Sequence, residues 1–228
     1  MKPEETFDRT IDRIIEKEWE MFRVVNGDTR VDCQEDHSTF DAMRRAQFSS
    51  WSESAAQNYL RDLTDAEAAG RNLVREKYIR MMRVTDPKGY EAFRSELPSL
   101  TPEQEQLISD IWEHMLGQTM RMREKYPAVA LGGRPLRAGE ETDTFASIET
   151  YQTSELATFS RATLEALLEH IEALEKEGTD LAFEIQKKSV AAMGYASMEE
   201  AERDISFRFI SSMGGGECTK CGVYEDRC

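Results

Sequence analysis

Apolar residues recur at the spacing of a helix along almost the whole chain. The first stretch shows this most clearly, with apolar side chains three or four positions apart at Phe7, Ile11, Ile14, Ile15, Trp19 and Phe22. Such a stripe is the face that an amphipathic helix turns toward a protein core. No stretch of the sequence alternates apolar and polar residues in the manner of a half-buried strand. The pattern therefore predicts an all-α fold, a helical bundle.

Signals for helix starts and stops divide the chain into several such helices. Thr101-Pro102-Glu103-Gln104 combines a capping residue, proline at the first helical position and glutamine at the third, which predicts a helix start. Helices are also expected over about residues 40–69, with a break near Trp51, and over residues 72–83. Residues 127–144 are rich in glycine and proline and are expected to be irregular.

The length of the chain, 228 residues, fits one domain with a buried core. We expect a single all-α domain over residues 1–210, whose short last helix opens at Ser197, and a flexible Gly/Cys tail over residues 211–228. The tail contains Cys218, Cys221 and Cys228, three of the four cysteines. The cysteines therefore cannot form a set of disulfide bonds that cross-links the fold.

An internal repeat divides the domain into two halves. Phe40-x6-Gln47 matches Phe145-x6-Gln152, 105 positions later, and Gly70-x2-Leu73-x2-Glu76 matches Gly178-x2-Leu181-x2-Glu184, 108 positions later. The matches predict an internal duplication with halves over about residues 7–95 and 101–208, packed with pseudo-two-fold symmetry. In this register Glu149 occupies the position of Arg44, so the two could form a buried pair that serves a ligand or only fixes the interface between the halves.

The charge of the chain restricts its partners. It has 29 Lys and Arg against 44 Asp and Glu, a formal net charge of −15, which argues against a DNA-binding protein or a general nucleic-acid binder. No apolar run approaches the roughly 18 residues of a membrane span, and the acidic N-terminus lacks the apolar core of a secretory signal. A cytoplasmic protein without a membrane partner is therefore expected. Two groups of basic residues are either solvated helix faces or local phosphate-binding stripes: Arg71, Arg75, Lys77, Arg80, Arg83 and Lys88, and Arg121, Arg123, Lys125, Arg134 and Arg137.

The loop before residue 40 concentrates reactive side chains. Cys33, Gln34, Glu35, Asp36 and His37 are consecutive and precede a predicted helix N-terminus, where backbone N–H groups favour an anion and lower the pKa of a thiol. Cys33 is a candidate nucleophile, with Asp36, Glu35 or His37 as its base. Because the neighbouring acids raise the pKa of a thiol, Cys33 is a candidate catalytic-site residue whose nucleophilic role stays open. A merely solvated polar loop is the alternative.

The second half carries a row of acceptors on one expected helix. Glu149 and Glu155 lie six positions apart, with Gln152 about one turn from each, and planar acceptors of this kind can hold a guanidinium. Glu149 is also a candidate catalytic base. The candidate substrate-binding residues of both halves are Arg30, Gln34, Arg44, Gln47, Trp51, Arg134, Tyr151, Gln152 and Glu155.

A metal site is a weaker alternative. Carboxylates at equivalent helix positions, Glu20 with Glu113 and Glu76 with Glu184, invite a di-metal centre, but that class of site needs Glu-x-x-His on two of its helices and this spacing is missing. The three thiols of the tail lack a fourth ligand within the tail. No metal and no other cofactor are therefore expected.

Several strings of residues carry a family resemblance. They are Trp19-Glu20-Met21-Phe22, Cys33-Gln34-x-Asp36, Phe40-x-x-Met43-Arg44-x-x-Gln47-x3-Trp51, Gly70-Arg71-Asn72-Leu73-x2-Glu76-Lys77-Tyr78, Gly133-Arg134-Pro135 and Glu149-Thr150-Tyr151. Together, over about residues 10–205, they resemble a family of helical proteins in bacteria and fungi that long stood as a domain of unknown function. The resemblance extends to fungal members identified as arginine-containing cyclodipeptide synthases.

The resemblance implies an enzyme of secondary-metabolite biosynthesis, an aminoacyltransferase that makes cyclo(Arg-Xaa) from arginyl-tRNA and a second aminoacyl-tRNA. Such a reaction needs a general base, for which Glu35, Asp36 and Glu149 are candidates, and Cys33 is the candidate acyl carrier. The family motif Asp-Asp-x-x-Glu has no match here, and Glu35-Asp36 and Glu140-Glu141 are the nearest equivalents. A non-enzymatic helical protein that binds a small ligand or a metal is the alternative. The second amino acid and the oligomeric state stay open.

Overall fold

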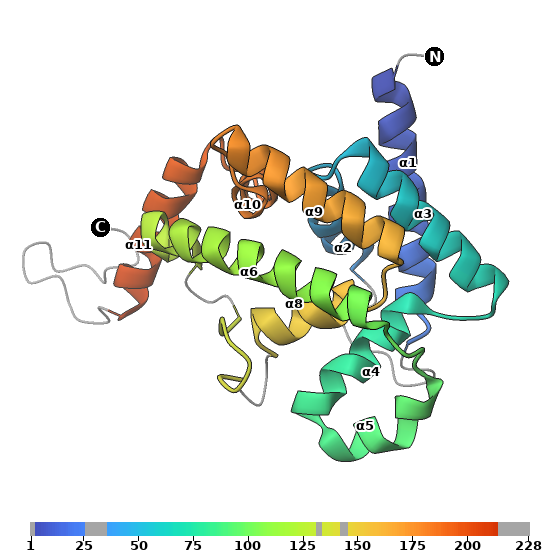
Figure 1. Ribbon diagram of the computed structural model, residues 1–228. Helices are drawn as coiled ribbons and strands as arrows, with labels where there is room; N and C mark the ends of the chain where they lie inside the picture. Colours follow the sequence, from blue (N-terminus) through green and yellow to red (C-terminus); the bar gives the residue numbers. More distant parts are fainter. Residues whose placement is uncertain (1–2, 26–35, 131–133, 142–145, 214–228) are drawn as a thin grey trace, which may run out of the picture.

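The computed structural model describes residues 3–25, 36–130, 134–141 and 146–213 (Figure 1). Within these ranges all regular secondary structure is helical and there is no strand, which confirms the predicted all-α class. The elements in chain order are α1 (Pro3–Phe22), α2 (His37–Phe48), α3 (Glu53–Ala68), α4 (Leu73–Thr85), α5 (Pro87–Phe93), the 3-10 helix η2 (Arg94–Glu96), α6 (Pro102–Lys125), α7 (Pro127–Ala130), α8 (Ile148–Leu156), α9 (Arg161–Lys176), α10 (Leu181–Ala192) and α11 (Met198–Met213).

Side-chain caps fix where several helices begin. The hydroxyl groups of Ser52, Ser147 and Ser160 each accept a hydrogen bond from the backbone N–H three residues on. Thr101 and Gln104 form the capping box that the sequence predicted for α6. These polar residues satisfy N–H groups that have no partner within the helix, so they determine the helix starts.

Glycines end α3 and α9. Gly70 has φ 68° and Gly178 has φ 77°, in the left-handed region that L side chains avoid. In each case the next backbone N–H, that of Arg71 or Thr179, donates to the carbonyl oxygen five positions back. This is the Schellman arrangement, which turns the chain sharply into the following helix.

The helices of the two predicted halves pack in matching pairs. α1 packs on α3 as α6 packs on α9, and α2 packs on α10 as α4 packs on α8, with α3 and α9 side by side at the centre (Figure 1). This is the arrangement that a duplication would produce. The duplication itself stays a prediction of the sequence.

Several equivalent helix ends of the two halves are separated by 108 positions. Ser52 and Ser160 cap α3 and α9 at equivalent places, and they are separated by the same 108 positions as Gln47 and Glu155. The last residues of α2 and α8, Phe48 and Leu156, have this separation too. The 105-residue offset of the sequence repeat rests on Phe145, which lies outside the described residues, so that offset stays a prediction.

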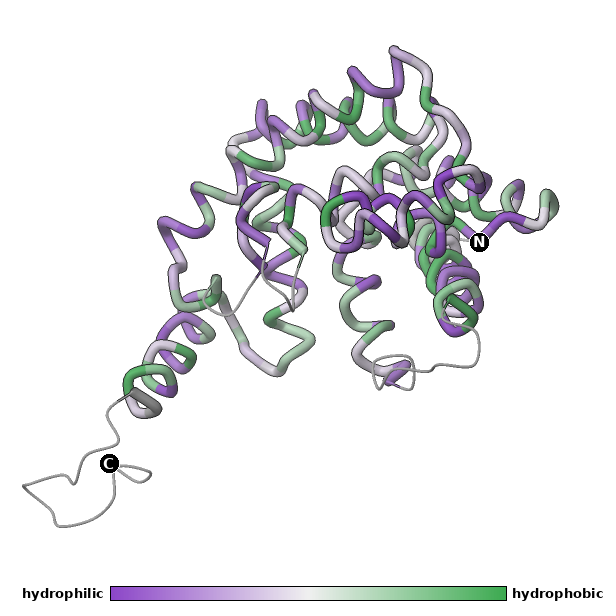
Figure 2. The backbone as a smooth tube through the Cα atoms, turned by 90° about the horizontal axis from the view of Figure 1, so that it is seen from below, coloured by the Kyte–Doolittle hydropathy of each residue, from purple (hydrophilic) through white to green (hydrophobic). Residues whose placement is uncertain are grey.

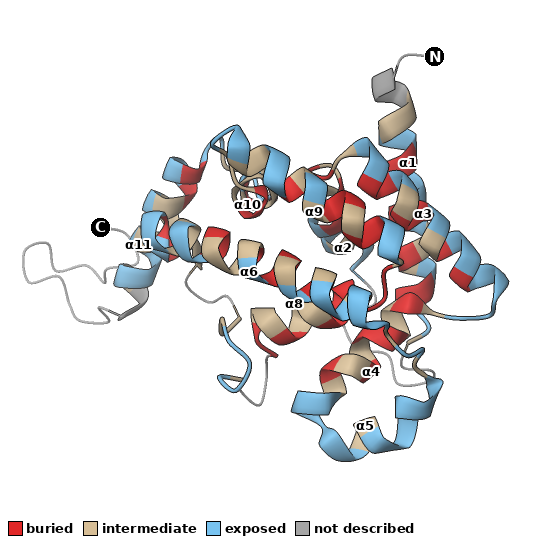
Figure 3. Ribbon diagram, in the orientation of Figure 1, coloured by how far each residue is buried: buried red, intermediate tan, exposed pale blue. Residues whose placement is uncertain are grey.

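The main core draws on both halves. Apolar residues recur at short intervals along the helices (Figure 2), and buried residues gather where α1, α3, α4, α6 and α9 face one another (Figure 3). At its centre is an aromatic cluster in which the ring centroids of Tyr59 and Phe159 are 4.7 Å apart and those of Trp51 and Phe159 are 5.8 Å apart. Trp51 and Phe159 follow equivalent helices, so the central contact joins the halves.

A second, smaller core lies at one end of the molecule. Tyr126, Val190, Met198 and Ala201 are buried against one another where α6, α7, α10 and α11 meet. The Tyr126 hydroxyl donates to Glu199 at 2.6 Å. This cluster attaches α11 to the rest of the bundle.

Three elements differ from the prediction. Asp86 follows the last residue of α4, and its side chain caps α5 by accepting from the Gly89 N–H, so a further helix begins just after the one expected over residues 72–83. α7 is a short helix inside the segment predicted to be irregular. α11 has 16 residues, so the last helix is not short. Within the described residues, no helix is both long and apolar enough to cross a membrane.

Candidate functional site

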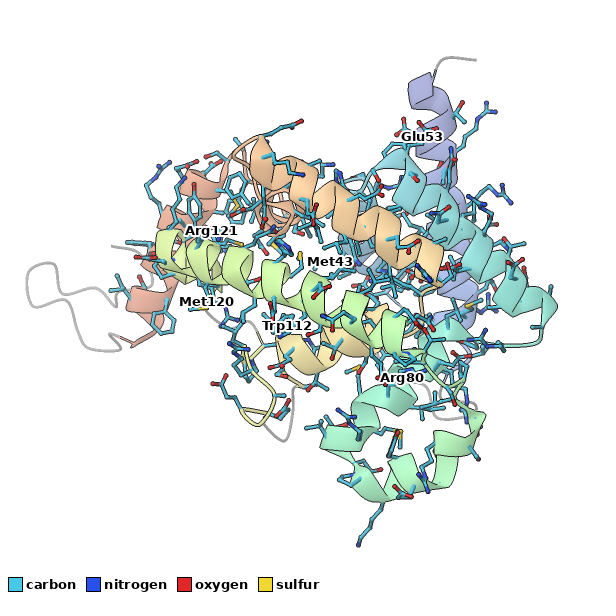
Figure 4. All side chains as sticks on the ribbon, viewed as in Figure 1. Met43, Glu53, Arg80, Trp112, Met120 and Arg121 are labelled. Carbon is cyan, nitrogen blue, oxygen red and sulfur yellow. The ribbon has the colours of Figure 1, made fainter. Side chains whose placement is uncertain are left out.

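A cavity of about 570 Å³ opens among helices of both halves, in the size range of small-molecule sites. Side chains from α1, α2, α3, α4, α6, α8, α9 and α10 line it, and most of the wall is apolar. Met43 of α2, which is labelled in Figure 4, is partly exposed and belongs to this lining. The cavity therefore lies where the predicted halves meet.

Four charged side chains are buried in the cavity wall. Glu18, Arg44, Lys77 and Glu155 are each less than a tenth exposed. The Arg44 guanidinium forms a bidentate pair with the Glu18 carboxylate, in which Nε donates to Oε2 and Nη2 donates to Oε1. The Tyr59 hydroxyl also donates to Glu18 Oε1. Such a planar fork on a carboxylate is the strongest geometry for an ion pair.

Glu155 links this pair to the second half. Its Oε1 lies 2.9 Å from Arg44 Nη1 and accepts from Lys77 Nζ at 2.8 Å. Gln47 bridges the same groups, because it accepts from Arg44 Nη1 at 2.8 Å and donates to Glu155 Oε2 at 3.0 Å. We call Glu18, Arg44, Gln47, Tyr59, Lys77 and Glu155 the charge network.

The periodicity of the helices explains why these charges are buried. Glu18 continues the apolar stripe of α1 after Ile14 and Ile15, and Lys77 lies one helical turn from both Leu73 and Met81 on the buried face of α4. Each charged side chain therefore occupies a core-facing position. Since burial of an unpaired ion is very unfavourable, the four side chains must satisfy one another.

The charge network shifts the pKa values of its members. Burial favours the neutral form of Glu155, but the charges of Arg44 and Lys77 outweigh it and hold the pKa of Glu155 at about 2. Burial likewise favours neutral Lys77, and the Glu155 charge overcomes it, so the pKa of Lys77 is raised. Burial and the Glu18 charge raise the pKa of Tyr59. At neutral pH the carboxylate and the ammonium are therefore both ionised.

Aromatic rings cover the cations of the site. Lys77 Nζ lies 3.6 Å from the ring centroid of Tyr151, and Arg134 Cζ lies 4.9 Å from the same centroid. Arg44 Cζ lies 4.6 Å from the ring centroid of Phe48. Such cation–π contacts stabilise positive charge away from water.

Asp36 provides a negative charge at the edge of the cavity. It is exposed, caps α2 and accepts from the Thr39 N–H at 3.0 Å. Hydrogen bonds from Thr39 and Ser38 lower the pKa of Asp36 to about 2. The rings of Phe22 and Phe40, which also line the cavity, stack with centroids 5.3 Å apart.

The cavity brings together most of the described candidate residues: Asp36, Arg44, Gln47, Trp51, Arg134, Tyr151, Gln152 and Glu155 all line it. Glu149 does not line it, and its carboxylate accepts from the backbone N–H of Ala138 at 2.9 Å. Arg30, Cys33, Gln34 and Glu35 lie outside the described residues. The cysteines of the tail lie outside them too.

Two predicted roles need correction. Arg44 pairs with Glu18 and Glu155, so the pair predicted between Arg44 and Glu149 is wrong. The row of Glu149, Gln152 and Glu155 cannot hold a guanidinium as predicted, because the Glu155 oxygens are taken by Lys77, Arg44 and Gln47, and Glu149 lies outside the cavity lining.

Sequence reasoning missed Glu18, Tyr59 and Lys77 as site residues. A signal was present, because Glu18 and Lys77 interrupt apolar stripes at positions that face the core. A charged side chain at a core position of an amphipathic helix indicates either a buried ion pair or a site.

The carboxylates considered for a metal centre are dispersed. Glu76 pairs with Arg71, Glu20 with Arg23, and Glu184 with Lys187. In the part of the chain that the structure describes, no group of three or more His, Cys, Asp or Glu side chains is arranged to hold a metal ion.

Two buried side-chain nitrogens of the described residues have no hydrogen-bond partner. They are Arg80 Nε and Trp112 Nε1, whose residues are labelled in Figure 4. Neither residue lines the cavity. The unsatisfied groups are therefore separate from the charge network.

Comparison with known proteins gives one match. A family model described as "Protein of unknown function (DUF4125)" matches residues 8–203. No curated protein and no solved structure matches the chain.

Proposed function

We propose that this chain, which belongs to the DUF4125 family of proteins of unknown function, is a tRNA-dependent cyclodipeptide synthase that joins arginine to a second amino acid. The family membership agrees with the resemblance found in the sequence. The arginine-containing product and the tRNA donors come from the likeness to fungal members of such a family. The cavity is the place proposed for the reaction.

The observation that carries the proposal is that the acidic and basic side chains of Glu18, Arg44, Lys77 and Glu155 are buried and paired in the wall of a ligand-sized cavity. Replacing such a network by apolar residues is often neutral or stabilising, so stability alone does not explain it. Buried and strongly perturbed ionisable groups cluster at active sites. The network is therefore best explained as the polar part of a site for a charged substrate.

The reaction balances as two aminolysis steps. In the first, the α-amino nitrogen of one aminoacyl group attacks the ester carbonyl carbon of the other, an amide bond forms, and the ester C–O bond to the tRNA ribose breaks. The amine proton ends on the ribose oxygen. The second step repeats this within the dipeptide, closes the ring and releases the second tRNA.

The described carboxylates suit binding better than proton transfer. A general base works best with a pKa near the operating pH, whereas the pKa values of Asp36 and Glu155 are both about 2. In the proposal Glu155 orients Arg44 and Lys77. Glu35 keeps its role as candidate proton acceptor, and Cys33 stays a candidate site residue because direct aminolysis needs no acyl carrier.

The distribution of charge favours one orientation of an arginyl group. Asp36 and the stacked rings of Phe22 and Phe40 lie together in the lining, and a guanidinium binds both carboxylates and aromatic faces. Lys77 and Arg44 lie deeper and are buried. We therefore place the guanidinium toward Asp36 and the reacting carbonyl toward Lys77.

A basic surface near the cavity supports a tRNA partner. α4 and α5 project from the bundle (Figure 1). Among the cations on and next to these helices, Arg71, Arg75 and Arg94 pair with glutamates. Among the described residues Arg83 and Lys88 have no acidic partner. Such free cations suit phosphate groups even on a protein of negative net charge.

The test is expression of the chain in a heterologous bacterial host, followed by mass spectrometry for arginine-containing diketopiperazines. The wild-type chain is expected to make them, and Glu155→Gln is expected to abolish them because Lys77 and Arg44 lose their common partner. Glu149→Gln is the matched control, a change of the same kind on the same helix but outside the cavity lining, and is expected to keep the product.

Circular dichroism of both purified variants separates a lost site from a lost fold. Absence of any such product from the wild-type chain contradicts the proposal. A Glu149→Gln variant that is folded but inactive, beside an active Glu155→Gln variant, contradicts the placement of the site.

One observation favours the second candidate, a non-enzymatic protein that binds a small ligand. Most of the cavity wall is apolar, and the charges of the network are paired without any ligand. In this case the purified protein would bind small molecules in the cavity and would leave arginyl-tRNA intact.

A further inference from the structure

Lys77 keeps hydrogen-bonding capacity that the charge network does not use. An ammonium group has three N–H donors. Within the described residues, Lys77 Nζ has one acceptor, Glu155 Oε1 at 2.8 Å, and it also contacts the ring of Tyr151. Lys77 is only 7% exposed and lines the cavity, so its remaining donors are largely shielded from bulk water.

Two neutral polar side chains of α8 also line the cavity. Tyr151 and Gln152 are adjacent on α8, both line the cavity, and Lys77 lies against the ring of Tyr151. Neither the Tyr151 hydroxyl nor the Gln152 amide has a hydrogen-bond partner among the described residues. Lys77 and Tyr151 therefore present unused donors next to each other in an otherwise mostly apolar cavity, and Gln152 adds an amide to the same lining.

The surrounding charges select the kind of ligand group. Glu155, the nearest acid, already accepts from Lys77 and Gln47 and contacts Arg44. Arg134 lies against the same Tyr151 ring as Lys77. A ligand cation here would meet these positive charges, whereas an oxygen acceptor would be attracted by them.

We infer that Lys77, the Tyr151 hydroxyl and the Gln152 amide form a subsite for an oxygen acceptor of the ligand, either a carboxylate or an ester carbonyl. The ester carbonyl of an aminoacyl group is the occupant only if the proposed synthase function holds. The subsite itself rests on the geometry of the cavity. In the aminolysis reaction, donors at this place would stabilise the negative charge that develops on the carbonyl oxygen.

The first experiment tests the subsite without arginine. Binding of 3-phenylpropionate and of the uncharged 3-phenylpropan-1-ol is measured by isothermal titration calorimetry and ligand-observed NMR. Lys77→Met is expected to weaken the acid about tenfold to a hundredfold, the effect of losing a charge-assisted hydrogen bond, and to leave the alcohol unchanged.

Lys188→Met is the matched control. Lys188 is also partly buried, donates to the Ser49 carbonyl oxygen and does not line the cavity. This variant is expected to bind both probes as the wild type does. Tyr151→Phe provides a second variant that keeps the ring on Lys77, and it is expected to weaken the acid about two- to tenfold. It tests the subsite even if Lys77→Met does not fold.

The inference is overturned if the wild type binds neither probe, or binds acid and alcohol equally. It is also overturned if folded Lys77→Met or Tyr151→Phe binds the acid as the wild type does. L-arginine methyl ester and agmatine, which lacks the carbonyl group, then test the proposed function separately. If 3-phenylpropionate binds through Lys77 and the arginine ester does not bind, the subsite stands and the arginine substrate is rejected.

Discussion

At the scale of single residues, the main feature is a chain of buried charges that alternate in sign. Glu18, Arg44, Glu155 and Lys77 follow one another through direct contacts, so each charge has an opposite neighbour. Loss of one partner from such a pair destabilises a protein by about 3–5 kcal/mol because an uncompensated charge stays buried. The stability of the fold therefore depends on the pairing of these four buried charges.

Acid is expected to destabilise the protein through Glu155. Its pKa is lowered from 4.5 to about 2 by Arg44 and Lys77, against the effect of burial. Between these values the unfolded chain binds a proton that the folded chain does not, so the stabilisation is complete above about pH 5 and is lost as the pH falls through about 2. The contribution is about 3 kcal/mol.

Urea unfolding followed from about pH 6 to about pH 3 measures this effect. The free energy of unfolding of Glu155→Gln should fall less steeply with pH than that of the wild type. Parallel curves for the two proteins would refute the assigned environment of Glu155.

Which residues form the site was only partly predictable from the sequence. Arg44, Gln47, Tyr151 and Gln152 were recognised from repeated motifs, and they line the cavity. The pairing of Arg44 with Glu155 was not predicted, because Glu155 lies far along the chain. The contact between the two side chains depends on how α2 and α8 approach each other. Local periodicity shows that a side chain faces the core but not which side chain it meets there.

At the scale of elements, capping residues and glycines determine the helix boundaries. The Thr101 capping box was predicted because this signal lies within a few residues of the boundary that it fixes. α5 was missed because Asp86 closes one helix and caps the next. A residue with both functions carries the same sequence signal as a simple helix stop.

Gly178→Ala is expected to destabilise the protein by about 1 kcal/mol, because alanine is strained in the left-handed region where a helix ends. Gly178 has φ 77°. Gly117→Ala is the opposite case: the residue is inside α6, and an added Cβ would meet only Arg121 Nη1 at an ordinary 3.5 Å.

Gly117→Ala should therefore stabilise the protein by about 1 kcal/mol. Midpoints of urea unfolding measure both changes. A Gly178→Ala protein as stable as the wild type would mean that α9 does not end in the left-handed conformation described.

At the scale of the whole molecule, the two predicted halves share one core and one cavity. Trp51 and Tyr59 of the first half contact Phe159 of the second, and Lys77 contacts Glu155 across the same boundary. The repeat in the sequence indicated two related halves and left open whether their polar residues meet. Their meeting depends on long-range packing, which no local pattern contains.

The halves are expected to unfold together. In protein labelled with fluorotryptophan, ¹⁹F NMR should give the same urea midpoint for Trp51 and Trp112, which lie in different halves and are both buried. Clearly separated midpoints would show that each half is stable alone, and would contradict the shared core.

The small core around Tyr126 has a different consequence for the molecule. α11 is held by this cluster and by hydrogen bonds such as those that the backbone N–H groups of Ala128 and Val129 in α7 donate to Glu202 of α11. No described residue of α11 lines the cavity. A unit with so few apolar contacts opens at lower free energy than the main core. We therefore expect the last helix to detach and return more readily than the helices of the main core, and to do so without breaking the ion pairs of the charge network.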